Sequence, residues 1–168
     1  MPADSRERHD PAMNDRTSSP ASPSEAVPGA QTLPADLVQA IDRSGEFRDL
    51  EPGAVLLRQR ERVRQLTVLV TGRLSTLVHV EGVGDLIVET TDEPGRMFGW
   101  SGLRAPWRAT ATVRADDRAR VVAIPLEALA DEPRWVAALC ALVAGSLADR
   151  AREIQQHRTA TGKGGDDA

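Results

Sequence analysis

The stretch RMFGWSGLRAPWRATATVRA, residues 96–115, decides the fold, because it joins a glycine turn to a strand with clear alternation. In its second half small apolar residues occupy every other position, which makes one face of a strand apolar and the other polar. Its first half adds tryptophan and arginine side chains to the turn. This stretch therefore predicts either a site for a charged guest or a turn plugged by aromatic rings. The apolar positions are Ala109, Ala111, Val113 and Ala115.

Around this stretch, short runs rich in Val, Leu and Thr recur between residues 53 and 125. They are separated by Gly, Asp, Glu and Pro, which favour turns. Many short strands at this spacing predict an antiparallel sandwich or barrel. The fold class that we expect is therefore mainly β.

Helices are expected on both sides of the strands. Residues 33–44 form one amphipathic helix that Gly45 ends, because its apolar residues follow a four-residue spacing. After Pro125, the sequence predicts a short helix and then a long helix over about residues 133–158. The apolar positions that carry the two main helices are Leu33, Leu37, Ile41, Val136, Leu139, Val143, Leu147 and Ile154.

Length and composition predict one domain, because 168 residues bury one core with little left for a second. We expect this domain over residues 32–158. Residues 1–31 are rich in Pro, Ser, Ala and charged residues, so we expect a disordered N-terminal tail. Residues 159–168 are expected to be a second disordered tail. The net charge of −4 offers no overall basic field, which argues against direct binding to nucleic acid or to an anionic membrane.

The location that we expect is the cytoplasm. Cys140 is the only cysteine, so no disulfide forms within the chain. The N-terminus is polar where a secretory signal needs an apolar stretch. The longest uncharged run, residues 135–148, is shorter than the roughly 18 to 20 residues that cross a bilayer, so no membrane segment is expected.

The ordered set of motifs resembles a bacterial cyclic nucleotide-binding domain. Residues 50–78, LEPGAVLLRQRERVRQLTVLVTGRLSTLV, resemble its first half, and residues 94–129 resemble its second half with the phosphate-binding cassette. Residues 131–150 resemble its closing helices. The resemblance covers about residues 33–153. It implies an antiparallel jelly-roll β-barrel with one N-terminal and two C-terminal helices.

The cassette of this chain departs from the family pattern at two positions. The family cassette begins with Phe-Gly-Glu, and here Phe98 and Gly99 match while Trp100 replaces the glutamate that binds the ribose hydroxyl. An indole has one donor and no acceptor, so it cannot replace that carboxylate. The family arginine that pairs with the phosphate falls on Ala109, and Arg108 stands one residue early, which on a strand reverses its face.

Three hypotheses for function follow from the resemblance. In the first, a non-catalytic sensor module binds a small anionic ligand such as a cyclic nucleotide, weakly or atypically. In the second, Trp100 and Trp107 fill the pocket and the domain is a ligand-free interaction module. The third is a conventional cyclic AMP-binding transcription regulator, of which this chain is a fragment. The ligand-binding residues of the first hypothesis are Phe98, Gly99, Trp100, Ser101, Gly102, Arg104, Arg108 and Thr110, with Thr112 as a further hydrogen-bonding residue.

Catalysis and metal binding are not expected. The motif GWSGL lacks the second glycine of a nucleophile elbow, because Leu103 stands there. The three histidines, His9, His79 and His157, lie in the tail, in one strand and in the last helix, so they predict no metal cluster. We therefore expect no catalytic residue, no metal and no cofactor other than the cyclic nucleotide ligand.

The long helix over residues 133–158 is expected to form a homodimer, because its apolar surface extends beyond one face and the family uses the equivalent helix as a dimer seam. Residues 159–168 are too few for a helix-turn-helix, so direct DNA binding is not expected. A signal would pass from the cassette to the C-terminal helices and on to a protein partner that the sequence does not identify.

Overall fold

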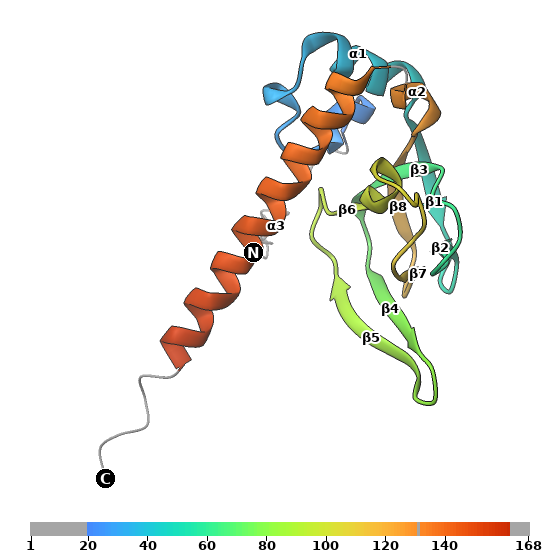
Figure 1. The fold of residues 1–168 in the computed structure, drawn as a ribbon, viewed down its shortest axis with the longest axis vertical. Helices are drawn as coiled ribbons and strands as arrows, with labels where there is room; N and C mark the ends of the chain where they lie inside the picture. The colour runs from blue at the N-terminus through green and yellow to red at the C-terminus, as the bar shows by residue number, and fades with distance from the viewer. Residues whose placement is uncertain (1–19, 131, 162–168) are drawn as a thin grey trace, which may run out of the picture.

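The computed structural model describes residues 20–130 and 132–161, which form two antiparallel sheets flanked by helices (Figure 1). The prediction of a mainly β fold with flanking helices is confirmed. The strands are β1 (Glu46–Leu50), β2 (Val55–Leu57), β3 (Gln65–Thr71), β4 (Leu74–Val80), β5 (Gly84–Thr91), β6 (Met97–Phe98), β7 (Thr112–Ala115) and β8 (Ala119–Pro125). The helices are η1 (Pro23–Ala26), η2 (Ala30–Thr32), α1 (Ala35–Ser44), η3 (Trp100–Leu103), α2 (Glu127–Ala130) and α3 (Pro133–Thr161).

The two sheets contain four strands each, and their strands interleave along the chain. One sheet runs β1-β8-β3-β6 and the other runs β2-β7-β4-β5. A first apolar cluster fills the space between them around Leu69, Phe98 and Val121. A second cluster lies between the first sheet and the helices, around Leu37, Leu66 and Leu139. The strands are apolar on the faces that meet these clusters, as burial of apolar surface requires.

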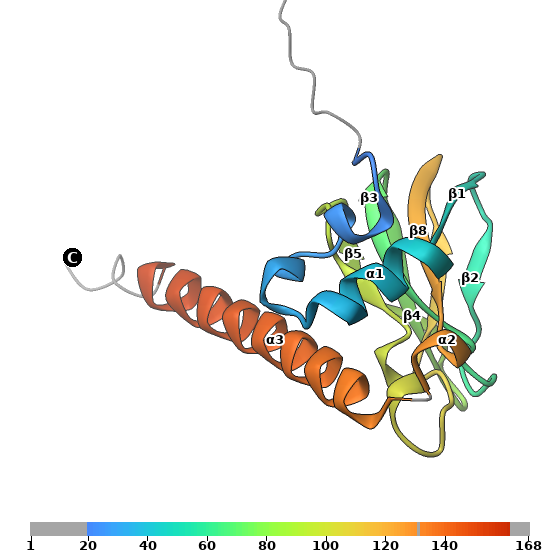
Figure 2. The same cartoon turned by 90° about the horizontal axis from the view of Figure 1, so that it is seen from above.

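The helices gather at one end of the sheets, and α3 then runs away from them as a long rod (Figures 1 and 2). Its first turn is joined to α1, because the Arg134 guanidinium and the Trp135 indole N–H both donate to the Asp36 carboxylate. Burial raises the pKa of Asp36, but Arg134, Trp135 and the backbone N–H groups of Asp36 and Leu37 outweigh it, so the pKa lies below its usual value. No helix in the described residues is long and apolar enough to cross a membrane.

The expected tail over residues 1–31 needs a correction. Residues 1–19 lie outside the described residues, but residues 20–31 carry η1 and η2 and pack on the domain. Val27 is 3% exposed and belongs to the core. The Asp42 carboxylate accepts hydrogen bonds from Ser24 N and Ser24 Oγ at 2.9 and 3.1 Å. A buried side chain and a long-range hydrogen bond order a segment whose composition alone predicts disorder.

The helix and strand boundaries also differ from the expected ones. The backbone of α3 continues to Thr161, so residues 159–161 of the expected C-terminal tail are helical, and residues 162–168 lie outside the described residues. Strand β7 is shorter than the run at 109–115, and of the four predicted apolar positions Ala109, Val113 and Ala115 are buried while Ala111 is partly exposed. The sequence did not predict β1, which has charged residues at three of five positions and pairs with β8.

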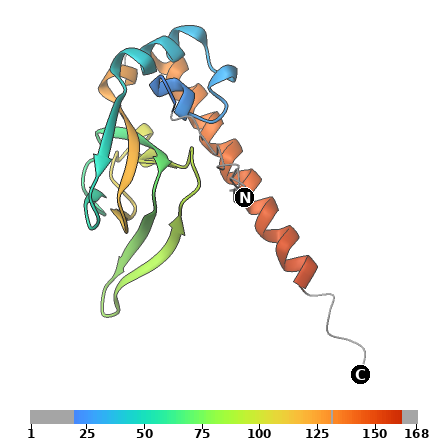
Figure 3. The same cartoon turned by 180° about the vertical axis from the view of Figure 1, so that it is seen from behind.

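The hairpin of β4 and β5 projects from the sheets at the end opposite α1 (Figure 3). It exposes a row of large aliphatic side chains. Val83 is 67% exposed, and Ile87 and Val88 are 60% and 58% exposed. A monomer rarely exposes so many neighbouring aliphatic side chains unless they meet a partner.

Candidate functional site

The cassette is built on a turn that requires glycine. Gly99 has φ = 82°, in the left-handed region, and a Cβ there would lie 2.5 Å from the Gln65 carbonyl oxygen of β3. No other residue fits both the dihedral angle and this approach. Because β6 pairs with β3 immediately before this turn, the chain leaves the sheet at a fixed point and enters η3.

A cavity of about 160 Å³ lies beneath the cassette. Residues from β2, β4, β5, β7 and α3 complete its wall, so one cavity is in contact with both the barrel and the long helix. This volume is below the 300–1,000 Å³ usual for a ligand pocket. The lining residues are Leu57, Thr76, Glu89, Arg96, Met97, Phe98, Gly99, Trp100, Ser101, Ala109, Thr110, Ala111, Val113 and Leu147.

An ion pair lies in this cavity wall. The Arg96 Nη2 atom is 2.9 Å from Glu89 Oε2, and the two side chains are 15% and 25% exposed. The Arg96 Nε atom is buried and has no hydrogen-bond partner. The cavity wall therefore contains one guanidinium whose charge is balanced by the Glu89 carboxylate, and the Nε donor of that guanidinium has no hydrogen-bond partner.

The structure brings five of the eight predicted ligand-binding residues into the cavity wall. The other three lie elsewhere. Gly102 is buried against Val63 and Leu126 on the other side of the cassette. Arg104 and Arg108 are exposed and do not line the cavity. The residues that line it are Phe98, Gly99, Trp100, Ser101 and Thr110.

Arg108, one of the predicted ligand-binding residues, does not line the cavity, in keeping with the reversal of face that its one-residue shift predicts. Its Nη1 atom donates to the Arg60 carbonyl oxygen at 2.8 Å. The neighbouring Ala109, at the family's arginine position, is 5% exposed and lines the cavity. The shift of one residue thus places a methyl group inside and the guanidinium outside. In the loop before β3, Arg60 has φ = 71°, in the left-handed region. Thr112 Oγ1 accepts a bond from Gln59 N at 3.1 Å instead of facing the cavity.

The two cassette tryptophans occupy different places. Trp100 belongs to the cavity wall but is 43% exposed. Trp107 is 49% exposed and lines a separate groove, so it does not fill the cavity. Of the two rings in the ligand-free hypothesis, only Trp100 is placed to restrict access.

Arg96 and Glu89 were missed by sequence reasoning. Arg96 opens the quoted stretch, but a charged residue beside a turn is usually solvated, and nothing local distinguishes it. The pair forms because β5 and the entry to β6 come together in space although they belong to different sheets. A charged residue directly before two buried residues, Met97 and Phe98, is the one local signal that could have indicated it.

Among the described residues, no group of three His, Cys, Asp or Glu side chains is arranged to hold a metal ion. His79 lies on the projecting hairpin, where its Nδ1 atom is 2.7 Å from Asp85 Oδ1. The pair is exposed on both sides.

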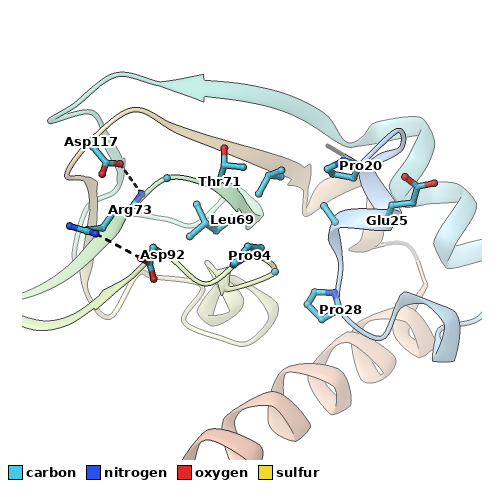
Figure 4. A pocket seen from close by; sticks show the side chains of 13 residues that line it. Pro20, Glu25, Pro28, Leu69, Thr71, Arg73, Asp92, Pro94 and Asp117 are labelled. Carbon is cyan, nitrogen blue, oxygen red and sulfur yellow. Dashed lines mark hydrogen bonds and ion pairs between the residues drawn. The ribbon is translucent and has the colours of Figure 1, made fainter. Parts of the chain in front are cut away.

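A larger cavity of about 760 Å³ lies between the N-terminal segment and the turn from β3 to β4 (Figure 4). Its charged side chains already have partners. The Asp117 carboxylate accepts a bond from Arg73 N at 2.9 Å, and Arg73 also forms a 3.8 Å ion pair with Asp92. Figure 4 shows these groups at one end and Pro20, Pro28 and Glu25 at the other. No cassette residue reaches this cavity.

Comparison with known proteins agrees with this geometry. The model of the cyclic nucleotide-binding domain family matches residues 47–132, just over half of the chain. The chain therefore belongs to the cyclic nucleotide-binding domain family. No curated protein matches the chain.

Solved structures show the same fold. A protein from Silicibacter pomeroyi DSS-3, provisionally named a cAMP-binding regulatory protein, has a TM-score of 0.61 and 19% identity over 80% of this chain. Thermus thermophilus catabolite activator protein has a TM-score of 0.57 and 18% identity over 77% of this chain. The N-terminal domain of a transcriptional regulator from Streptomyces coelicolor A3(2) has a TM-score of 0.52 and 17% identity over 83% of this chain.

The chain spans only part of some of these relatives. It covers 63% of the Silicibacter protein and 61% of the Thermus protein, but 94% of the Streptomyces domain. The shared part is the fold of two antiparallel sheets and their flanking helices.

Proposed function

We propose that this protein is a non-catalytic, cytoplasmic regulatory module whose cassette cavity binds a small anionic ligand weakly or atypically. The observation that carries this proposal is the cavity wall itself, which includes both Arg96, just before the cassette, and Leu147 of α3. A ligand at Arg96 would contact the helix that leaves the domain. Ligand occupancy would therefore be coupled to the packing of α3.

The weakness of binding has two physical causes. The cavity lacks the two family side chains that contact ribose and phosphate, and each hydrogen bond to a charged group contributes about 1.5–3 kcal/mol. Glu89 also competes with an incoming anion for Arg96, because its carboxylate is 2.9 Å from the guanidinium. A cyclic nucleotide would have to displace or share this contact.

A thermal shift experiment tests the proposal. We expect millimolar cyclic AMP or cyclic GMP to raise the melting temperature slightly, since a ligand that binds only the native state stabilises it. The shift should disappear in Arg96→Met and persist in Arg118→Glu, whose partner Glu51 is remote from the cavity. No shift with either nucleotide would contradict ligand binding and favour the ligand-free alternative.

A gain-of-function variant sharpens this test. Restoring both family residues in Trp100→Glu/Ala109→Arg should raise the affinity for cyclic AMP at least about tenfold, because two charge-assisted hydrogen bonds return. Trp100 is nearly half exposed, so the new carboxylate would not be buried without solvent. An unchanged affinity would show that the cavity no longer has the family's shape.

The alternative function, a ligand-free interaction module, is favoured by the small cavity volume of about 160 Å³ and by Trp100 in its wall. Under this alternative the partner would be a protein. The third candidate, a fragment of a conventional cyclic AMP-binding regulator, has less support, because the phosphate-binding arginine is absent from the cavity.

We also propose a homodimer through α3. Its supports are the 40% exposure of Leu147 and the aliphatic row on the β4–β5 hairpin. Light scattering at micromolar concentration should give twice the monomer mass, and Leu147→Glu should lower it. A monomer in the wild-type protein would contradict the dimer.

A further inference from the structure

The outer surface of the cassette is strongly basic although the protein is acidic overall. Two loops build it: the loop from β2 to β3 and the cassette loop at 104–108. In the described part of the chain no carboxylate lies within ion-pair distance of any of their arginines, whereas most of the other described arginines have a carboxylate partner. The outer arginines are Arg58, Arg60, Arg62, Arg64, Arg104 and Arg108.

The backbone holds the two loops side by side. Val63 N donates to the Trp107 carbonyl oxygen at 2.9 Å, and Ala109 N donates to the Glu61 carbonyl oxygen at 2.8 Å. These bonds flank an antiparallel bridge in which Arg62 lies opposite Arg108. Like charges directly opposite each other on neighbouring strands are destabilising. An anion bound at this bridge would relieve that repulsion.

A groove of about 650 Å³ opens beside this bridge. Arg62 and Arg64 are exposed residues at its rim, and the buried Val63 between them lines it as well. Aliphatic side chains form its floor, and Trp107 forms one wall. The remaining lining residues are Gly102, Leu103, Leu126, Glu127, Leu129 and Val136.

We infer that this groove binds an acidic segment of a protein partner, with one large apolar side chain seated between the arginines. The aliphatic floor fits an apolar side chain, and the two rim arginines lie about 6.6 Å apart along the chain, the spacing of alternate residues in an extended segment. The partner segment would therefore carry acidic residues at alternate positions. The inference goes beyond the proposed function and holds whether or not the cavity binds a ligand.

Two other polyanions fit the groove less well. Single-stranded nucleic acid needs several aromatic rings for stacking, but Trp107 is the one ring among the described lining residues. An anionic membrane is attracted by net positive charge, but the net charge here is −4. Both remain as outcomes of the test.

Selection of displayed random peptides of about a dozen residues against the full chain tests the inference. We expect enrichment of peptides with acidic residues at alternate positions around Leu, Ile or Phe. A labelled synthetic peptide of the enriched sequence should bind in fluorescence anisotropy at physiological ionic strength. Its Kd should rise at least about tenfold in Arg62→Glu/Arg64→Glu, because two charge pairs become repulsive. It should stay within about twofold in Arg118→Glu, an exposed arginine on the far loop.

The variants also report on folding. Arg62→Glu replaces the repulsion with Arg108 by an attraction, so the melting temperature of the double variant should not fall. The inference is overturned if no peptide is enriched or if the enriched peptides lack acidic residues. It is also overturned if the Kd of the enriched peptide is the same for the double variant as for the wild-type protein. It is also overturned if oligothymidylate or phosphatidylserine vesicles bind more tightly than any selected peptide and lose binding in the double variant.

Discussion

The inner, cavity-facing side of the cassette and its outer surface differ in whether their arginines have carboxylate partners. Inside, Arg96 is balanced by Glu89 within a small cavity, so the protein supplies its own counterion. Outside, Arg62 and Arg108 face each other with no carboxylate partner among the described residues. A charge that already has a partner favours stability, whereas a charge without one favours recognition. We therefore expect the stronger anion binding on the surface of the protein rather than in its cavity.

The largest loss of stability is expected at Gly99, the turn that begins the cassette and so positions both of its faces. Gly99→Ala should destabilise the fold by about 2–4 kcal/mol, because it combines a left-handed φ with a backbone clash. Gly53→Ala is the matched control, since Gly53 has φ = 85° but nothing lies within 4 Å of the new Cβ. It should cost only about 1 kcal/mol. Urea unfolding of both variants measures the difference. Equal costs would show that the contact with Gln65 does not restrict the turn.

A second experiment changes the inner face alone. Arg96→Met should cost about 1–3 kcal/mol, less than a fully buried pair because both side chains keep some exposure. The double variant Arg96→Met/Glu89→Leu should cost less than the sum of the two single variants, as expected for coupled residues. Denaturant unfolding gives the coupling energy. Additive costs would mean that the 2.9 Å contact contributes nothing to stability.

The smallest effect concerns Asp36, which belongs to neither face. Its pKa is lowered in the folded protein, so its contribution to stability is complete above the unfolded pKa and is lost as pH falls through the folded value. Asp36→Asn should therefore lower the melting temperature slightly at pH 7, and the difference should shrink as pH falls through the folded pKa. Melting curves of both proteins across this range check the sign. A difference that grows toward acid would contradict the lowered pKa.

The fold was largely predictable from local patterns. The alternation at 109–115 and the four-residue spacing at 33–41 both arise because one face of the element is buried. Such patterns can be read from residues that are close together in the sequence. The segment at 20–31 was not predictable, because its order depends on Asp42, which is 18 residues from Ser24 in the chain. Strand β1 was missed because it pairs along one side only and keeps charged side chains.

The sequence predicted where the site lies in the chain, but it did not predict which charged side chains line the cavity. Phe98 and Gly99 identified the cassette, and five of the eight candidates line the cavity. The positions of Arg96 and Arg108 depend on how strands of different sheets meet. The shift of one residue that places Ala109 inward and Arg108 outward was visible in the sequence, whereas the place of Arg96 in the cavity wall was not.

The length of α3 determines how far a movement of the helix at Leu147 would displace its C-terminal end. The helix has 29 residues, so at about 1.5 Å per residue it is roughly 43 Å long, and about 21 Å of it lies beyond Leu147. If the helix tilts as a rigid body about its first turn, Thr161 moves further than Leu147, because Thr161 lies further from the pivot. If the proposed ligand tilts the helix about the Asp36–Arg134 contact, a partner bound near Thr161 would therefore be displaced further than the cavity wall itself.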